Sequence, residues 1–490
     1  MSRITGGQLL VEVLAQHGAR LVFSIIGGQM CSIYDELGRR PDMKLVTLRN
    51  EAAAPVMAAG AAAVSGLPAV SMCTVGAGVV YEAAGLLAAW HGFLPVISIA
   101  PQVQSWKMNP HQENLQGLNQ HRLFEPITKW TAIVYHFERI PQLVNRAIRE
   151  ALANAPGPVH LDLPVDVLFQ TRKLSARKKA RLMPAAEHSR FCGSLPGPTA
   201  QVKRAGQALL ESQRPLVLVG QALGRPGRCP ELRDHLNRLG APALLGDVSS
   251  GIMNGADPVY VSPLALFTES EEGRRALSKS DLVLVIGLDD QLKEAISGFE
   301  PDQPLVQVEV DPSALLVGRK NHLAVNADPV SFLSSLDKGP ASGAASWRTW
   351  LEEMQRTADR LSRELSESSP RLAALFKGLA PGLGDHDLVV VDGAEPVKAA
   401  RAFLRDSRQD GLFLMNARDL AGSGLPFAIG ARIARPDKAV LLVADRDSLL
   451  RQVQELQTAQ AQGAGICMVI TDPGGGEART RFRAILEGLG

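Results

Sequence analysis

Short runs of β-branched and aliphatic residues alternate along the chain with longer stretches rich in alanine and leucine. Apolar runs of about four to eight residues that end at glycine, proline or a polar turn are typical of buried strands, and the longer stretches between them are typical of helices. Strands that alternate with helices indicate parallel sheets with crossover connections. In the first third of the chain the pattern predicts strands at residues 21–26, 44–48, 70–74, 96–100 and 159–163.

The alternation continues to the end of the chain but is interrupted twice. The first interruption, residues 170–198, is basic and contains proline, and its run Arg177-Lys178-Lys179 is most simply a solvated surface. The second begins at Lys338-Gly339-Pro340 and leads into a charged helical segment. The further predicted strands lie at residues 215–220, 243–245, 282–287, 305–310, 388–391, 412–415, 439–443 and 466–470.

These interruptions divide the chain into parts that each have the size of a domain. We therefore expect an α/β protein with three doubly wound parallel-sheet domains. Between them we expect a linker and then a second linker with a helix. The predicted domains are residues 1–169, 199–337 and 384–490, the first linker is 170–198, and the linker with a helix is 338–383.

Composition narrows the function classes. The 490 residues include 52 Lys and Arg against 50 Asp and Glu, so the net charge of +2 gives no reason to expect nucleic acid or a membrane as partner, and a small-molecule substrate remains. Five scattered cysteines fit neither a disulfide framework nor a zinc cage and suggest a reducing cytoplasm. No signal peptide is apparent, and apolar runs break well before the roughly 20 residues of a membrane span.

Glycine-rich loops follow three of the predicted strands. In open parallel sheets, ligands bind where the carboxyl ends of strands meet helix N-termini, because unpaired backbone N–H groups gather there. The second loop lacks the third glycine of a dinucleotide fingerprint, so we do not expect nicotinamide binding. The loops are Gly27-Gly28, Gly76-Ala77-Gly78 and Gly474-Gly475-Gly476.

Six segments, spread over nearly the whole chain, carry a joint resemblance to one family. They read VFSIIGG (22–28), RNEAAA (49–54), GLLAAW (85–90), PITKW (126–130), GPVHLDLP (157–164) and GSGLPFAIGA (422–431). In this order they resemble the thiamine-diphosphate-dependent enzymes of the acetolactate synthase, pyruvate oxidase and 2-hydroxyacyl-CoA lyase group. The resemblance implies a pyrimidine-binding domain, a central domain and a diphosphate-binding domain, in that order.

The resemblance assigns the activation of thiamine diphosphate to Glu51. The thiazolium carbon of this cofactor must lose a proton, and its aminopyrimidine can take that proton if a buried carboxylate hydrogen-bonds the ring nitrogen. Glu51 stands at the family's position for this carboxylate, at the start of a helix. Without the resemblance, an acid at a helix N-terminus stabilised by the helix dipole would be the simpler interpretation.

The resemblance also assigns site roles to other residues of the first domain. The resemblance places Gln116 at the active-site glutamine that contacts substrate, with His111 and His121 on either side of it. It places the cofactor beside Gly27, Gly28, Gly76 and Gly78. The family usually has Ser-Gly-Pro-Gly-Ala-Thr-Asn in the last of these loops, whereas this chain has VGAGVVY at residues 75–81, so the polar contacts of that loop are missing.

The diphosphate end departs further from the family, which binds Mg²⁺ through Gly-Asp-Gly and a later Asn. The resemblance places the metal at Asp445, Asp472 and Gly474, and the cofactor beside Gly422, Gly424, Leu420, Ala444 and Arg446. Ala444 and Arg446 replace the two glycines, and Ala421 stands where a bulky residue props the cofactor. Arg446 either contributes charge toward the phosphates or fills the volume that they need.

The resemblance implies a lyase or carboligase that breaks or forms a C–C bond next to the carbonyl of a 2-oxo acid or 2-hydroxyacyl compound. It also implies a homodimer or homotetramer, because the family builds each site from two subunits, and a segment closing the site is expected to be missing after Asp472. The alternative is a homologue that has lost thiamine diphosphate and serves as a partner or scaffold subunit, or has altered chemistry. The turns at 219–222 and 286–290 are ordinary strand ends, so FAD or an ADP-type nucleotide is not expected there.

Overall fold

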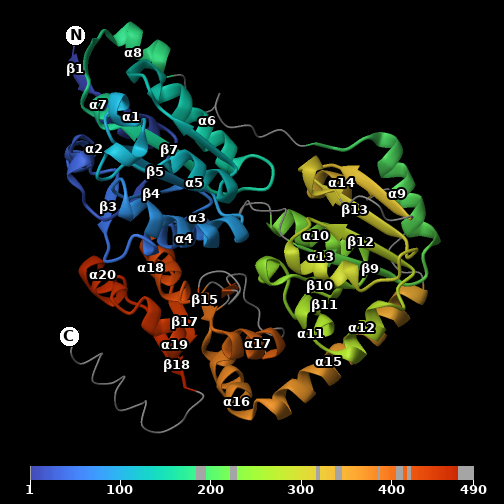
Figure 1. The fold of residues 1–490 in the computed structure, drawn as a ribbon. Coiled ribbons are helices and arrows are strands. Elements are labelled where there is room, and N and C mark those ends of the chain that lie inside the picture. Colours follow the sequence, from blue (N-terminus) through green and yellow to red (C-terminus); the bar gives the residue numbers. More distant parts are fainter. Residues whose placement is uncertain are drawn as a thin grey trace. The chain divides into compact units, whose positions relative to one another are not determined.

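The first 183 residues are built around a six-stranded parallel sheet. The computed structural model describes residues 2–183, 195–220, 229–315, 321–336, 345–384, 387–403, 412–415 and 421–472. The chain forms two compact units, residues 1–192 with 417–490 and residues 193–416 (Figure 1). The strand order of the first sheet is β3 (Lys44–Thr47), β2 (Leu21–Ser24), β4 (Ala69–Met72), β5 (Val96–Gln102), β7 (Val159–Pro164) and β6 (Trp130–Ile133).

Helices connect these strands in the way that a parallel sheet requires. They are α1 (Gly6–Gln16), α2 (Cys31–Leu37), α3 (Ala53–Ser65), α4 (Ala77–His91), α5 (Gln120–Phe124), α6 (Ile140–Leu152) and α7 (Val165–Phe169). Ten residues of α3 are buried, most of them alanine, so this helix packs closely on both sides. In α6 the buried residues recur at helical spacing, which leaves its other face in solvent.

The range expected as the first linker contains regular structure at its beginning. Strand β8 (Thr171–Leu174) pairs antiparallel with β1 (Ser2–Thr5), and α8 (Ala176–Leu182) follows. Lys179, from the basic run, forms an ion pair with Glu12 on α1 at 2.6 Å, while Arg177 and Lys178 are exposed as expected. The alternation of apolar residues did not indicate β8 because three of its four side chains are exposed.

The C-terminal part of the first unit packs against α3. It contains α18 (Gly424–Ala434), β17 (Val440–Asp445), α19 (Arg446–Arg451), α20 (Glu455–Gln462) and β18 (Cys467–Thr471), and the two strands are parallel. Helices α18 and α3 cross where their backbones nearly touch (Figure 1). A Cβ atom on Gly60 would lie 2.1 Å from the carbonyl oxygen of Phe427, and one on Gly430 would lie 1.9 Å from that of Met57.

The second unit contains another six-stranded parallel sheet and one further parallel strand pair. The sheet has the order β11 (Tyr260–Pro263), β10 (Ala243–Leu245), β9 (Pro215–Val219), β12 (Leu282–Ile286), β13 (Leu305–Glu309) and β14 (His322–Asn326). The strand pair is β15 (Leu388–Asp392) and β16 (Leu412–Met415).

Two tryptophans fix the long helix of the second unit. Its helices are α9 (Thr199–Glu211), α10 (Cys229–Leu239), α11 (Leu264–Thr268), α12 (Glu271–Leu277), α13 (Asp290–Ser297), α14 (Pro329–Leu336), α15 (Ala345–Ser368), α16 (Pro370–Leu379) and α17 (Ala394–Phe403). On α15, Trp347 and Trp350 are buried, and their indole N–H groups donate to the carbonyl oxygens of Ser212 and Pro215 at 2.9 Å each. These bonds pin the helix to the strand β9 region.

The α/β fold class is confirmed. Each predicted strand is present, with its ends shifted by at most two residues. Strands β6, β11 and β14 were not predicted, and β6 and β14 are only partly buried, so their sequences lack the apolar runs that mark the other strands. Within the described ranges, none of the helices is both long and apolar enough to traverse a lipid bilayer.

The crossing of α3 and α18 can be tested with one methyl group. We expect Gly430→Ala to lower the free energy of unfolding of the first unit by about 1–3 kcal/mol, because the added carbon forces two packed backbones apart. Gly378→Ala, on α16 of the second unit, is the control for alanine in place of a helical glycine, since a Cβ there meets nothing within 4 Å. Urea denaturation of both variants provides the measurement, and equal stability of the two would show that the crossing is loosely packed.

Candidate functional site

Glu51 occupies the turn that joins β3 to α3, at the carboxyl end of the first sheet. The side chain of Asn50 accepts a hydrogen bond from the amide of Ala52 at 2.9 Å and so shapes this turn. A Cβ on Gly78 would lie 3.4 Å from Glu51 Oε1 and 3.1 Å from Thr74 Oγ1. The Glu51 carboxylate therefore lies beside the first turn of α4, which begins in the glycine loop after β4.

Gln116 lies over the same glycine loop. Gly76 has a φ of +88°, a conformation that favours glycine, and a Cβ there would lie 3.4 Å from the Cβ of Gln116. The side-chain amide of Gln116 donates to the carbonyl oxygen of Val75 at 3.4 Å and accepts from Gln29 Nε2 at 2.9 Å. The structure thus brings Glu51, Gly76, Gly78 and Gln116 to one place, although 65 residues of sequence separate the first from the last.

The first glycine loop contributes packing and one further residue. A Cβ on Gly27 would lie 1.7 Å from Thr74 Cγ2, so only glycine allows this loop to contact the threonine next to Gly78. A Cβ on Gly28 would meet nothing within 4 Å, which leaves open space beside it. Gln29, which orients Gln116, was not identified from the sequence, because a single glutamine after two glycines carries no recognisable pattern.

Glu455 holds the backbone in front of Glu51. Its carboxylate accepts from the amide of Arg49 at 3.0 Å and from Thr458 Oγ1 at 2.7 Å, and it lies on α20, more than 400 residues away in sequence. Arg49 Nε also donates to Gln457 Oε1 at 3.1 Å. Glu455 is buried, and that burial raises the pKa of its carboxyl. No sequence motif pointed to this residue.

A buried carboxyl also supports α4. Glu82 is fully buried and accepts from Ser71 Oγ at 2.5 Å and from Cys73 Sγ at 2.6 Å, which ties the helix to the end of β4. Burial raises the pKa of Glu82 and that of the Cys73 thiol. Burial thus disfavours the charged forms of both groups beneath the loop that contains Gly76 and Gly78.

The residues expected at the diphosphate end make contacts among themselves. Asp445 is the N-cap of α19, and its carboxylate accepts from the amide of Ser448 at 2.7 Å. Arg446 Nη1 donates to Asp472 Oδ2 at 3.4 Å, and Arg446 Nε donates to Asp447 Oδ1 at 3.1 Å. The side chain of Asp472 is only 14% exposed, so its charge faces the guanidinium across a mostly buried contact.

These contacts do not fit a divalent cation. Mg²⁺ requires roughly octahedral coordination by about six oxygens, several of them from carboxylates, carbonyls or water. Here one carboxylate caps a helix and the other binds a guanidinium, whose positive charge would repel a metal ion. Across the ranges that the structure describes, no three His, Cys, Asp or Glu side chains gather where they could hold a metal ion.

The remaining predicted residues of this end have structural contacts or fall outside the described chain. Gly422 has a φ of +89°, and a Cβ there would lie 2.6 Å from the carbonyl oxygen of Ser448, so the loop before α18 packs on α19. Gly424 is buried at the start of α18. The carbonyl oxygen of Ala444 accepts from Thr471 Oγ1 at 3.4 Å. Leu420 and Gly474 lie outside the described residues.

Comparison with known proteins identifies the family. Residues 4–123 match the model of the thiamine pyrophosphate enzyme N-terminal TPP binding domain, and residues 202–336 match that of the thiamine pyrophosphate enzyme central domain. The chain therefore belongs to the thiamine pyrophosphate enzyme family, whose cofactor is thiamine diphosphate. The first match contains Glu51, Gly76, Gly78 and Gln116.

Similar proteins cover most of the chain at low identity. Acetolactate synthase isozyme 1 large subunit of Escherichia coli is 27% identical over 483 residues, covering 96% of this chain and 81% of the relative. 2-Hydroxyacyl-CoA lyase 2 of Danio rerio is 26% identical over 494 residues, covering 92% and 77%. Acetolactate synthase of Bacillus subtilis is 25% identical over 484 residues, covering 95% and 80%.

The contact of Glu455 with the Glu51 turn predicts a pH dependence of stability. Because its folded pKa lies above the ordinary 4.5, the folded protein holds this proton more tightly than the unfolded chain does. Glu455 therefore destabilises the fold progressively as pH rises through 4.5 toward the folded pKa. We expect the Tm of Glu455→Gln, measured by calorimetry, to increase relative to that of the unmodified protein as pH rises above 4.5. A Tm difference between the two proteins that stays constant with pH would contradict a raised pKa of Glu455 in the folded protein.

Proposed function

We propose that the chain is an enzyme that uses thiamine diphosphate to break or form a C–C bond next to the carbonyl of a 2-oxo acid or 2-hydroxyacyl substrate. The observation that carries the proposal is the Glu51 carboxylate beside Gly78, at the carboxyl end of a parallel sheet in the domain that matches the family's N-terminal TPP binding domain. The names of the similar proteins, acetolactate synthase and 2-hydroxyacyl-CoA lyase, support this substrate class.

The described residues of the first domain fit the aminopyrimidine half of the cofactor. Thiamine diphosphate, when bound, supplies a nucleophilic thiazolium carbon and accepts the negative charge that C–C cleavage leaves behind. Glu51 would hold a proton against a nitrogen of the aminopyrimidine ring. Glycines 76 and 78 keep Cβ atoms out of the space beside this carboxylate. Gln116, oriented by Gln29, would position the carbonyl or carboxylate of the substrate.

At the diphosphate end we propose that Arg446 takes the place of the divalent cation. A guanidinium carries permanent charge and several N–H donors in one plane, which suits phosphate oxygens. Asp472 holds this guanidinium in place at 3.4 Å, as a carboxylate ligand would hold a metal. The diphosphate would then bind without Mg²⁺, although with one positive charge fewer.

A second candidate function rests on the same ion pair. If Arg446 fills the volume of the diphosphate instead of binding it, the chain is a homologue without thiamine diphosphate that serves as a partner or scaffold subunit, or has altered chemistry in the same cleft. The pairing of Arg446 with Asp472 and Asp447 is compatible with this candidate as well, because the guanidinium has two acidic partners without a phosphate.

Organisation and location are proposed on the family pattern. We propose a cytoplasmic homodimer or homotetramer with a pyrimidine-binding domain at residues 1–169, a central domain at 199–337 and a diphosphate-binding domain at 384–490. In support of a reducing compartment, the three cysteines whose side chains are described, Cys31, Cys73 and Cys467, are free thiols.

Cofactor binding distinguishes the two candidates. We expect calorimetry to detect thiamine diphosphate binding with the same affinity in EDTA and in excess Mg²⁺, and we expect Arg446→Ala to weaken it at least tenfold. Arg435→Ala is the control, since Arg435 pairs with Asp437 on the surface. A strict need for Mg²⁺ would contradict the role of Arg446. Absence of binding at millimolar cofactor would instead favour the homologue without cofactor.

Glu51 provides a separate test of catalysis. If its carboxylate holds the aminopyrimidine proton, Glu51→Gln should lower turnover of 2-oxo acids by roughly 10²- to 10⁴-fold, the usual share of general acid–base catalysis. Affinity for thiamine diphosphate should change little, because the diphosphate is held elsewhere. Glu113→Gln, at an exposed position of the 103–119 loop, is the matched control. Unchanged turnover in Glu51→Gln would exclude this residue as the activator.

A further inference from the structure

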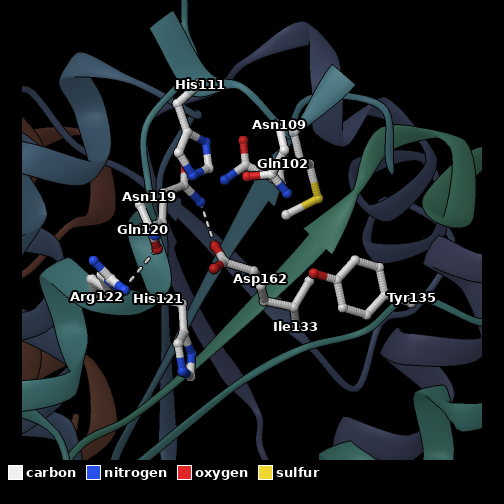
Figure 2. A pocket seen from close by; sticks show the side chains of 11 residues that line it. Gln102, Asn109, His111, Asn119, Gln120, His121, Arg122, Ile133, Tyr135 and Asp162 are labelled. Carbon is white, nitrogen blue, oxygen red and sulfur yellow. Dashed lines mark hydrogen bonds between the residues drawn. The ribbon is translucent and has the colours of Figure 1, made fainter. Parts of the chain in front are cut away.

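A small polar cavity lies at the carboxyl ends of β5 and β7, outside the residues assigned to the candidate site. Its volume is about 170 Å³, and it is lined by Gln102 and Asp162 from the strand ends, by the loop that contains His111, and by Gln120 of α5. Figure 2 shows the Asp162 carboxylate next to Gln120, with the ring of His111 above them. Neither Glu51 nor Gln116 lines this cavity.

Asp162 presents one unpartnered oxygen. The residue is fully buried, and its Oδ1 accepts from Gln120 Nε2 and from His160 Nε2, the latter at 3.1 Å. Its Oδ2 is buried and has no hydrogen-bond partner among the residues that the structure describes. An unsatisfied carboxylate oxygen away from water costs free energy, so a further donor at this atom would be stabilising.

Three further atoms of the cavity lining lack partners within the described part of the chain. The amide of Gln120 has a fixed orientation, because its Nε2 donates both to Asp162 Oδ1 and to the carbonyl oxygen of Pro101 at 3.2 Å. Its Oε1 is therefore an acceptor, and within the described part of the chain it is unpaired. The Nδ1 atoms of His111 and His121 are likewise buried and unpaired there. By contrast, both polar atoms of Gln102 are used, toward Val103 and Leu118.

We propose that this cavity binds a small primary ammonium compound. Its three N–H donors match three of the four unpaired atoms of the described lining, namely Asp162 Oδ2, Gln120 Oε1 and His111 Nδ1, and its charge matches the carboxylate. A carboxylate or phosphate ligand in contact with Asp162 Oδ2 and Gln120 Oε1 would be repelled by these two acceptors, whereas Arg122 supplies a positive charge elsewhere in the lining. Cavities for drug-sized ligands are about 300–1,000 Å³, so this one suits a compound of few non-hydrogen atoms, whose alkyl part can contact Met108 and Ile133.

The proposal does not depend on thiamine diphosphate. The cavity and Gln116 share the loop of residues 103–119, and Leu118 in this loop accepts from Gln102 Nε2 at 3.0 Å. Gln102 and Asn119, at the two ends of this loop, both line the cavity, so an occupant would contact both ends of the loop without contacting the cofactor residues Glu51 and Gln116.

Methylammonium chloride is the probe for the full-length protein. At constant ionic strength with sodium as the balancing cation, we expect saturable binding of ¹⁵N-labelled methylammonium by NMR and a saturable rise in Tm. Tetramethylammonium, which has the charge but no N–H group, should give neither. An equal saturable effect of KCl would overturn the proposal in favour of an alkali-metal site, and no saturable effect of methylammonium would overturn it outright.

Variants assign the effect to the cavity. Asp162→Asn should weaken methylammonium binding at least tenfold and His111→Ala about threefold or more, whereas Asp35→Asn, at an exposed position on α2, should leave it unchanged. His111 is only half-buried, so its variant remains informative if Asp162→Asn does not fold. Crystals soaked with methylammonium give the direct view. Density at Asp162 Oδ2 that refines as ordered water and does not change on soaking would overturn the proposal.

Discussion

The close crossing of α3 and α18 is the constraint on which the candidate site depends. Two glycines, Gly60 and Gly430, let the helix backbones approach so closely that a methyl group at either position would overlap a carbonyl oxygen. Glu51 stands directly before α3, and the segment after α18 supplies Glu455, which accepts the Arg49 amide. Loss of the crossing would therefore release the turn that presents Glu51.

The two ends of the candidate site differ in how much of the family pattern they keep. Near Glu51, the glycines, the carboxylate and Gln116 occupy one place, and buried Glu82 supports the helix beneath them. At β17 and β18, a guanidinium and a helix cap use the two carboxylates that the family pattern assigns to a metal. In our proposal the charge that binds the diphosphate comes from Arg446, and in the alternative the diphosphate does not bind. If the diphosphate binds, the chain is a thiamine-diphosphate enzyme; if it does not, the chain is the homologue without the cofactor.

Sequence reasoning located the strands because most of them are buried on both faces and read as continuous apolar runs. It missed β6 and β14, where half-buried side chains break the run, and the β1–β8 pair, whose paired residues lie 166 to 172 positions apart in sequence. The resemblance brought together Glu51 and Gln116 but could not choose a partner for Arg446. The resemblance could not identify Glu455 or the Asp162 cavity, because both arise from contacts between residues that are distant in sequence and share no motif.

In our proposal, the guanidinium of Arg446 replaces the divalent cation in a site that still binds thiamine diphosphate. Anomalous scattering from crystals grown with thiamine diphosphate and MnCl₂ tests it most directly, because manganese would mark any metal bound to the diphosphate. The account predicts density for the aminopyrimidine beside Glu51, phosphate oxygens in contact with Arg446, and no manganese peak at Asp445 or Asp472. A manganese peak bound to these two carboxylates, with Arg446 turned away, would contradict it.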